Sequence, residues 1–144
     1  MAIRIVQLGS PRHGNEGLRI GTVRRPPRAV SKTAFASGHW YDVWFPTLAP
    51  SVETMKLGQA AKTPAQWAAF SKTYRGEMST PHARHAIALL AALSHTTHVP
   101  VGCYRDDESH CHRSVLRALL TEHGATIAIA RKGLSPSQAS PRGD

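Results

Sequence analysis

The chain has 144 residues, the size of a single domain with room for a sizeable hydrophobic core. Lysine and arginine total 18 against 9 acidic residues, and the net charge of +9 favours an anionic partner such as nucleic acid, a nucleotide or a phosphorylated metabolite; solubility alone is the other explanation. No apolar run is long enough to span a membrane, and two cysteines without a secretory signal indicate a cytoplasmic protein.

Two strands and a basic loop are predicted at the start of the chain. Alternating apolar residues indicate strands at residues 2–8 and 18–23. The prolines of the following loop prevent helix formation and regular sheet pairing, and they lie among three arginines: Arg24, Arg25 and Arg28. A stiff loop loses little entropy on binding and could clamp an anion, whereas a solvated basic surface is the alternative.

An aromatic run and three helices follow. Residues 39–45 are rich in aromatic side chains and are predicted to be core, with base stacking as the alternative. Residues able to cap a helix predict helix starts near Val52, Pro64 and Pro81. Two sets of large residues recur at helical spacing and should face the core: Trp67, Phe70, Tyr74 and Met78, then Ile87, Leu90 and Leu93.

The most informative stretch is residues 98–124. It predicts a buried strand at 98–104, a helix from about 110 to 123 that Ser109 caps, and another strand at 125–130. A strand–helix–strand unit makes its strands parallel, and ligands then bind beyond the carboxyl ends of the strands, against helix N-termini. We therefore expect a functional site at this strand-to-helix turn.

The predicted fold is a single α/β domain with a mainly parallel sheet, flanking helices and a C-terminal βαβ unit. This domain covers residues 1–130. Residues 131–144 are rich in Ser, Pro and Gly and are expected to form a disordered basic tail.

Anion binding is the first functional interpretation of the turn. Free backbone amides and the positive end of the helix dipole meet near Cys111 and His112, and Arg113 could add a bidentate contact. The arginines of the front loop could close the site. The acidic residues just upstream, 106–108, could instead neutralise the same helix end.

Thiol chemistry is the second interpretation, in which Cys111 is the catalytic nucleophile of a hydrolase or transferase. A thiolate at a helix N-terminus beside Arg113 should have a lowered pKa. The spacing from Cys111 to Arg117 fits the outline of a cysteine phosphatase loop, although the glycines of such a loop are missing. Cys103 lies on the buried strand and is expected to be an inert core residue.

No metal or cofactor is predicted. The two cysteines are separated by seven residues, and the adjacent Cys111 and His112 would point in different directions on a helix. A purely structural interpretation also stands, in which His112 bonds a loop carbonyl and Arg113 pairs with an upstream aspartate. The chain would then be an interaction protein without a small-molecule ligand.

Four stretches together resemble the bacterial family called domain of unknown function 488, which includes the YeaO-like proteins. They are the basic proline segment at 24–32, the Trp and Ala-Pro-Ser pattern at 41–51, the helix with Trp67, Phe70, Tyr74, Glu77 and Met78, and the stretch from Val101 to Arg113. Glycine is usual in the family where Ala29 stands. The resemblance implies an α/β fold and candidate residues over about 2–130, and no particular reaction.

Overall fold

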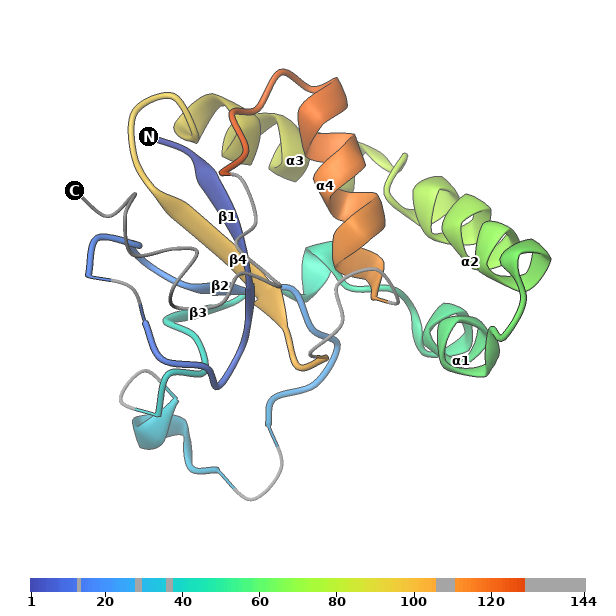
Figure 1. Ribbon diagram of the computed structural model, residues 1–144, viewed down its shortest axis with the longest axis horizontal. Helices are drawn as coiled ribbons and strands as arrows, with labels where there is room; N and C mark the ends of the chain where they lie inside the picture. The colour runs from blue at the N-terminus through green and yellow to red at the C-terminus, as the bar shows by residue number, and fades with distance from the viewer. Residues whose placement is uncertain (13, 28–29, 36–37, 106–110, 129–144) are drawn as a thin grey trace, which may run out of the picture.

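The computed structural model describes residues 1–12, 14–27, 30–35, 38–105 and 111–128. These residues form a parallel sheet with four α-helices, so the predicted single α/β domain is confirmed (Figure 1). Arg28, Ser109, the upstream acidic residues and the C-terminal tail lie outside the described ranges.

The sheet has four parallel strands in the order β1-β4-β2-β3. Their bounds are Ile3–Gln7 for β1, Ile20–Gly21 for β2, Val43–Trp44 for β3 and Val99–Cys103 for β4. Strand β4 lies between β1 and β2, and every one of its residues is buried. Such a strand reads as a continuous apolar run, which explains why the sequence identified it clearly.

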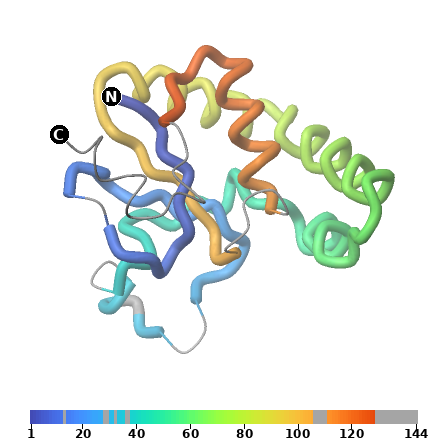
Figure 2. The backbone as a smooth tube through the Cα atoms, viewed as in Figure 1, coloured from blue at the N-terminus to red at the C-terminus, as the bar shows by residue number. Residues whose placement is uncertain are grey.

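The direction and the shared sheet of the predicted βαβ unit are confirmed, but the described part of the expected strand at 125–130 forms only a single parallel bridge, and β1 lies between the two segments. Helix α4 (His112–Glu122) leads from β4 to a segment in which Ile127 forms a parallel bridge with Ile3 of β1. The N–H of Ile3 donates to the carbonyl of Thr126 at 2.8 Å. The two segments therefore share one sheet and one direction, with β1 between them, and Figure 2 shows the end of the described chain beside β1.

The helix starts agree with the predicted capping signals. The bounds are Val52–Ala60 for α1, Pro64–Glu77 for α2 and Pro81–Leu93 for α3. Ser51 accepts a hydrogen bond from the Thr54 amide, and Thr63 forms a capping box with Gln66. Within the described ranges, the helices are too short or too polar to span a membrane.

Most of the predicted core positions are buried. Phe70, Tyr74 and Met78 pack under the sheet with the inner face of α4, whereas Trp67 is partly buried at the edge of this cluster. Leu93 was predicted to be core and is 36% exposed, because it is the last residue of α3. A smaller cluster contains both cysteines, with Val6, Leu8, Val23 and Tyr41.

The aromatic run at 39–45 is core only in part. Tyr41 is buried, whereas Trp44 is 44% exposed. Trp44 lies on β3, the edge strand of the sheet, so no neighbouring strand covers it on one side. The indole N–H of Trp44 donates to the carbonyl of Val23 at 2.8 Å. The run therefore closes one edge of the sheet rather than filling its interior.

Arg19, just before β2, is a basic residue in the interior of the protein. Its side chain is fully buried and pairs with the buried carboxylate of Glu16. The guanidinium also donates to the carbonyls of Ser10 and His39, at 2.8 and 2.6 Å. The expected strand at 18–23 is shorter in the structure, where β2 covers only Ile20–Gly21 directly after this ion pair.

Glu77, the last residue of α2, connects its own helix with the Ala-Pro-Ser stretch that precedes α1. Its carboxylate accepts hydrogen bonds from the Ser51 amide at 3.0 Å and from the Thr54 hydroxyl at 2.6 Å. Burial acts to raise the pKa of Glu77, but these hydrogen bonds and the charge of Arg24 outweigh it and lower the pKa. Glu77 thus ties the start of α1 to the end of α2.

Candidate functional site

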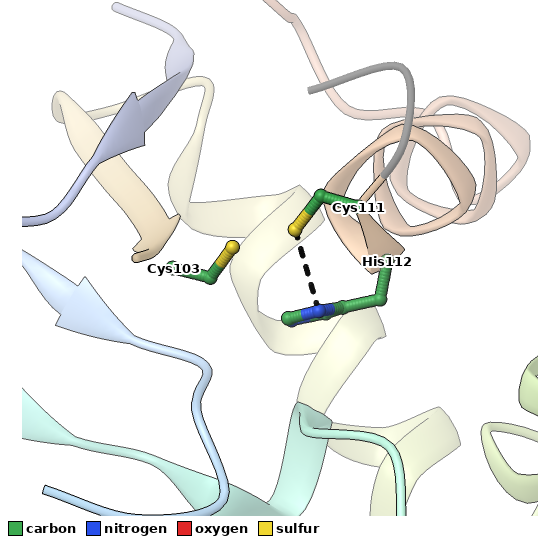
Figure 3. A group of neighbouring side chains, drawn as sticks. All are labelled: Cys103, Cys111 and His112. Carbon is green, nitrogen blue, oxygen red and sulfur yellow. Dashed lines mark hydrogen bonds between the residues drawn. The ribbon is translucent and has the colours of Figure 1, made fainter. Parts of the chain in front are cut away.

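Both cysteines lie at the turn between β4 and α4. Cys103 is the last residue of β4, and Cys111 is the N-cap of α4, so the prediction that Ser109 caps this helix is wrong. The two sulfur atoms and a ring nitrogen of His112 all lie within 4.8 Å of one another. Figure 3 shows the three side chains converging from the strand and from the start of the helix.

The convergence of Cys111 and His112 contradicts the expectation that their side chains diverge. Divergence requires that both residues have helical backbone angles. Cys111 instead has φ −137° and ψ 154°, the extended conformation of an N-cap. Its sulfur therefore folds back to within 3.6 Å of His112 Nδ1.

The His112 ring is held from its other nitrogen. Nε2 lies 2.8 Å from the carbonyl oxygen of Thr22 and 3.2 Å from its hydroxyl. A carbonyl can only accept, so Nε2 carries the hydrogen and Nδ1 faces the thiol. The ring also contacts the edge of Tyr74, with centroids 5.5 Å apart. The hydrogen bond to a loop carbonyl that the structural interpretation predicted is present.

The pKa values of the two thiols shift in opposite directions. A hydrogen bond from the Cys103 thiol lowers the pKa of Cys111 most, burial opposes this, and His112 and the Arg113 charge lower it further. The pKa of Cys103 is raised, chiefly because it donates that hydrogen bond, with burial adding to the effect. The two thiols therefore compete for one proton, and Cys103 holds it more tightly than Cys111.

Arg113 fastens the turn from inside the protein. Its side chain is 2% exposed, and it donates to the carbonyls of Val6, at 2.5 Å, and Arg105. Val6 lies in the last part of β1 and Arg105 follows the end of β4, so the guanidinium joins both strands to the start of α4. A Cβ on Gly102 would lie 2.6 Å from the same Val6 oxygen, which explains the glycine there.

The thiol turn opens onto a cavity of about 910 Å³. Cys103, Cys111 and His112 line it, together with Arg24 and Arg25 of the basic loop. The further lining residues are Gln7, Leu8, Gly9, Ser10, Val23, Pro26, Pro27, Trp40, Pro50, Met55, Gly58, Gln59, Trp67, Phe70, Tyr104 and Arg105. Of the predicted site residues, Arg24, Arg25, Cys111 and His112 thus meet at one cavity, whereas Arg113 is buried and is not among the residues that line it.

Two contacts hold the basic loop against this cavity. The guanidinium of Arg24 donates to the carbonyls of Pro50, at 3.2 Å, and Ala49, at 3.0 Å. The hydroxyl of Tyr104 donates to the carbonyl of Arg25 at 2.7 Å. Since Tyr104 directly follows Cys103, the same short segment carries one thiol and anchors the loop.

The phosphatase-loop outline is wrong. A phosphate loop needs several backbone amides that converge on one point, but the residues between Cys111 and Arg117 form the first turns of α4. Arg117 lies on this helix and is not among the residues that line the cavity.

Among the residues that the structure describes, Cys103, Cys111 and His112 could together offer three ligands to a soft metal ion. The positive charge of Arg113 beside the thiols favours a bare thiolate over an additional cation. Sequence reasoning treated Cys103 as inert and overlooked its role beside Cys111. The signal that could have found it is its position, because the end of an inner parallel strand faces the next helix N-terminus.

These features define an α/β protein with a thiol–imidazole site at the turn after an inner parallel strand. Residues 3–124 match the family model DUF488-N3a, described as the active DUF488-N3 subclade, so the chain belongs to the DUF488 family. The predicted family is confirmed. No curated protein and no solved structure matched the chain.

Proposed function

We propose that the protein is a hydrolase or transferase in which the Cys111 thiolate attacks an anionic substrate bound in the cavity. The observation that carries this proposal is the chain of contacts from Cys111 to His112 to Thr22. A nucleophile beside a base, with the base oriented by a third group, is the arrangement that activates cysteine nucleophiles.

The charge of the cavity supports an anionic substrate. Three arginines line it, Arg24, Arg25 and Arg105, and no carboxylate does within the described residues. Arginine binds phosphate and carboxylate groups with two parallel hydrogen bonds. The first-turn amides of α4 add a positive dipole end at the same place.

The proposed reaction has two steps. In the first step Nδ1 of His112 takes the proton of the Cys111 thiol and the sulfur forms a bond to an electrophilic atom of the substrate. The leaving group departs with the electron pair of its broken bond and takes that proton from Nδ1. Water or another acceptor then gives its proton to Nδ1 and displaces the sulfur, which restores the thiolate.

The second candidate is an anion-binding protein without covalent chemistry. The low exposure of Cys111, 3%, favours it, because a buried cysteine commonly behaves as a small apolar residue. In that case the arginines would bind the ligand and the thiols would only pack beneath it.

Alkylation with iodoacetamide against pH separates the two candidates. With a lowered pKa, folded Cys111 should react at a pH well below the ordinary thiol pKa of about 8.5, whereas Cys103 should react only after unfolding. Cys103→Ser keeps a hydrogen-bond donor and should retain this reactivity, and Cys103→Ala should move it to higher pH. If Cys111 reacts only near or above the ordinary thiol pKa, the nucleophile is excluded and the binding protein remains.

A further inference from the structure

We infer that the cavity binds a mononucleotide, with its phosphate on the arginines and its base against the aromatic side chains of the wall. This inference deepens the proposed function and rests on the same cavity. Binding can nevertheless be measured whether or not Cys111 reacts.

The size of the cavity indicates a ligand larger than an inorganic anion. About 910 Å³ lies near the upper end of the range of small-molecule sites, roughly 300–1,000 Å³. An inorganic anion would fill a small part of this volume. A substrate held only by its charge would therefore leave most of the wall in contact with water.

The charged part of the cavity is organised before any ligand arrives. Arg24 is fastened through its guanidinium to the carbonyls of Ala49 and Pro50, and the Arg25 backbone is fastened to Tyr104. Pro26 and Pro27 follow directly and stiffen the loop. A phosphate that binds here loses less loop entropy than it would on a flexible basic segment.

Two aromatic pairs make up much of the remaining wall. Trp67 and Phe70 of α2 are stacked, with ring centroids 4.7 Å apart, and Trp40 contacts Tyr104 edge to face at 5.9 Å. All four side chains line the cavity. Flat bases stack on such side chains, and this interaction accepts every base because each has a π face.

Glycines back one ring of each pair. A Cβ on Gly58 would lie 2.9 Å from Phe70, and a Cβ on Gly9 would lie 2.9 Å from Trp40. Trp40 thus lies directly against the backbone at Gly9. Phe70 is buried against Gly58 and supports the partly exposed Trp67 ring that is stacked on it. A sugar phosphate would use the arginines and ignore these rings, and a nucleoside would do the reverse, so the combination indicates a nucleotide.

Calorimetric titration of the full chain tests this inference with three probes: adenosine monophosphate, ribose 5-phosphate and adenosine. The nucleotide should bind at least about tenfold more tightly than either fragment, because only it uses both parts of the wall. Guanosine and cytidine monophosphate should also bind. Ribose 5-phosphate binding as tightly as the nucleotides, or no nucleotide binding, would overturn the inference.

Variants separate the two contributions. Trp67→Leu, and independently Trp40→Leu, should weaken nucleotide binding and leave ribose 5-phosphate binding unchanged, whereas Arg25→Ala should weaken both. Trp44→Leu and Arg75→Ala are matched controls, since neither residue lines the cavity, and should change nothing. Equal losses with Trp44→Leu and Trp67→Leu would contradict the stacking role.

Two more measurements relate nucleotide binding to the thiol chemistry and to polynucleotide binding. A mononucleotide should protect Cys111 from iodoacetamide if both proposals hold, and nucleotide binding with an unreactive Cys111 would leave the inference standing while excluding thiol chemistry. An oligonucleotide that binds more tightly than the mononucleotide, with a steep salt dependence, would overturn it in favour of a polynucleotide surface.

Discussion

Replacement of Glu16 with glutamine is expected to lower the free energy of unfolding by about 3–5 kcal/mol, the usual effect of breaking a buried ion pair from one side. The substitution leaves the fully buried Arg19 guanidinium without its counter-charge. Its carbonyl partners at Ser10 and His39 remain, but carbonyl dipoles do not neutralise a buried cation.

Urea denaturation measures this effect. Glu122→Gln is a suitable control, since Glu122 pairs with Arg75 on the exposed surface and should contribute little. Replacing both Glu16 and Arg19 with apolar residues of similar size should recover part of the loss, because no charge then stays buried unpaired. An effect of Glu16→Gln as small as that of Glu122→Gln would show that the pair does not hold the front of the domain.

Replacement of Arg113 with methionine should have two effects. Stability should fall by about 2–5 kcal/mol, since the buried carbonyl of Val6 and the partly buried carbonyl of Arg105 lose their donor. The pKa of Cys111 should also rise, because the Arg113 charge is one of the causes that lower it. Cys111 labelling should then move to higher pH.

Arg113→Lys separates these effects. Lysine keeps the positive charge but cannot reproduce the planar fork that reaches two carbonyls, so stability should fall while Cys111 stays reactive. Labelling that is unchanged in a folded Arg113→Met protein would show that this charge does not act on the thiol.

The sequence predicted helix α4 and strand β4 well, because each is determined by a local pattern of residues. Helix α4 combines apolar residues at i,i+4 spacing with Gly124, whose φ of +86° ends the helix as a C′ glycine does. Strand β4 is buried on both faces and therefore reads as an apolar run. In both cases the sequence contains the whole physical cause.

The meeting of the site residues at one cavity could not be predicted from local sequence patterns. Arg24 follows β2 and Cys103 ends β4, and the two meet because these strands are parallel neighbours whose carboxyl ends share one edge of the sheet. The order of the strands is a tertiary property that neither segment encodes alone. The approach of Cys111 to His112 likewise depends on the extended backbone of one residue.

The ultraviolet absorbance of the thiolate, titrated with pH in the folded protein and compared with Cys111→Ser, tests the central claim most directly. A thiol whose pKa is lowered below neutral is charged at neutral pH and loses its charge only as the pH falls through that lowered value. We therefore expect a thiolate signal at neutral pH that disappears on acidification and is absent from Cys111→Ser. A signal that rises only near the ordinary thiol pKa of about 8.5, or one that Cys111→Ser retains, would contradict a Cys111 nucleophile.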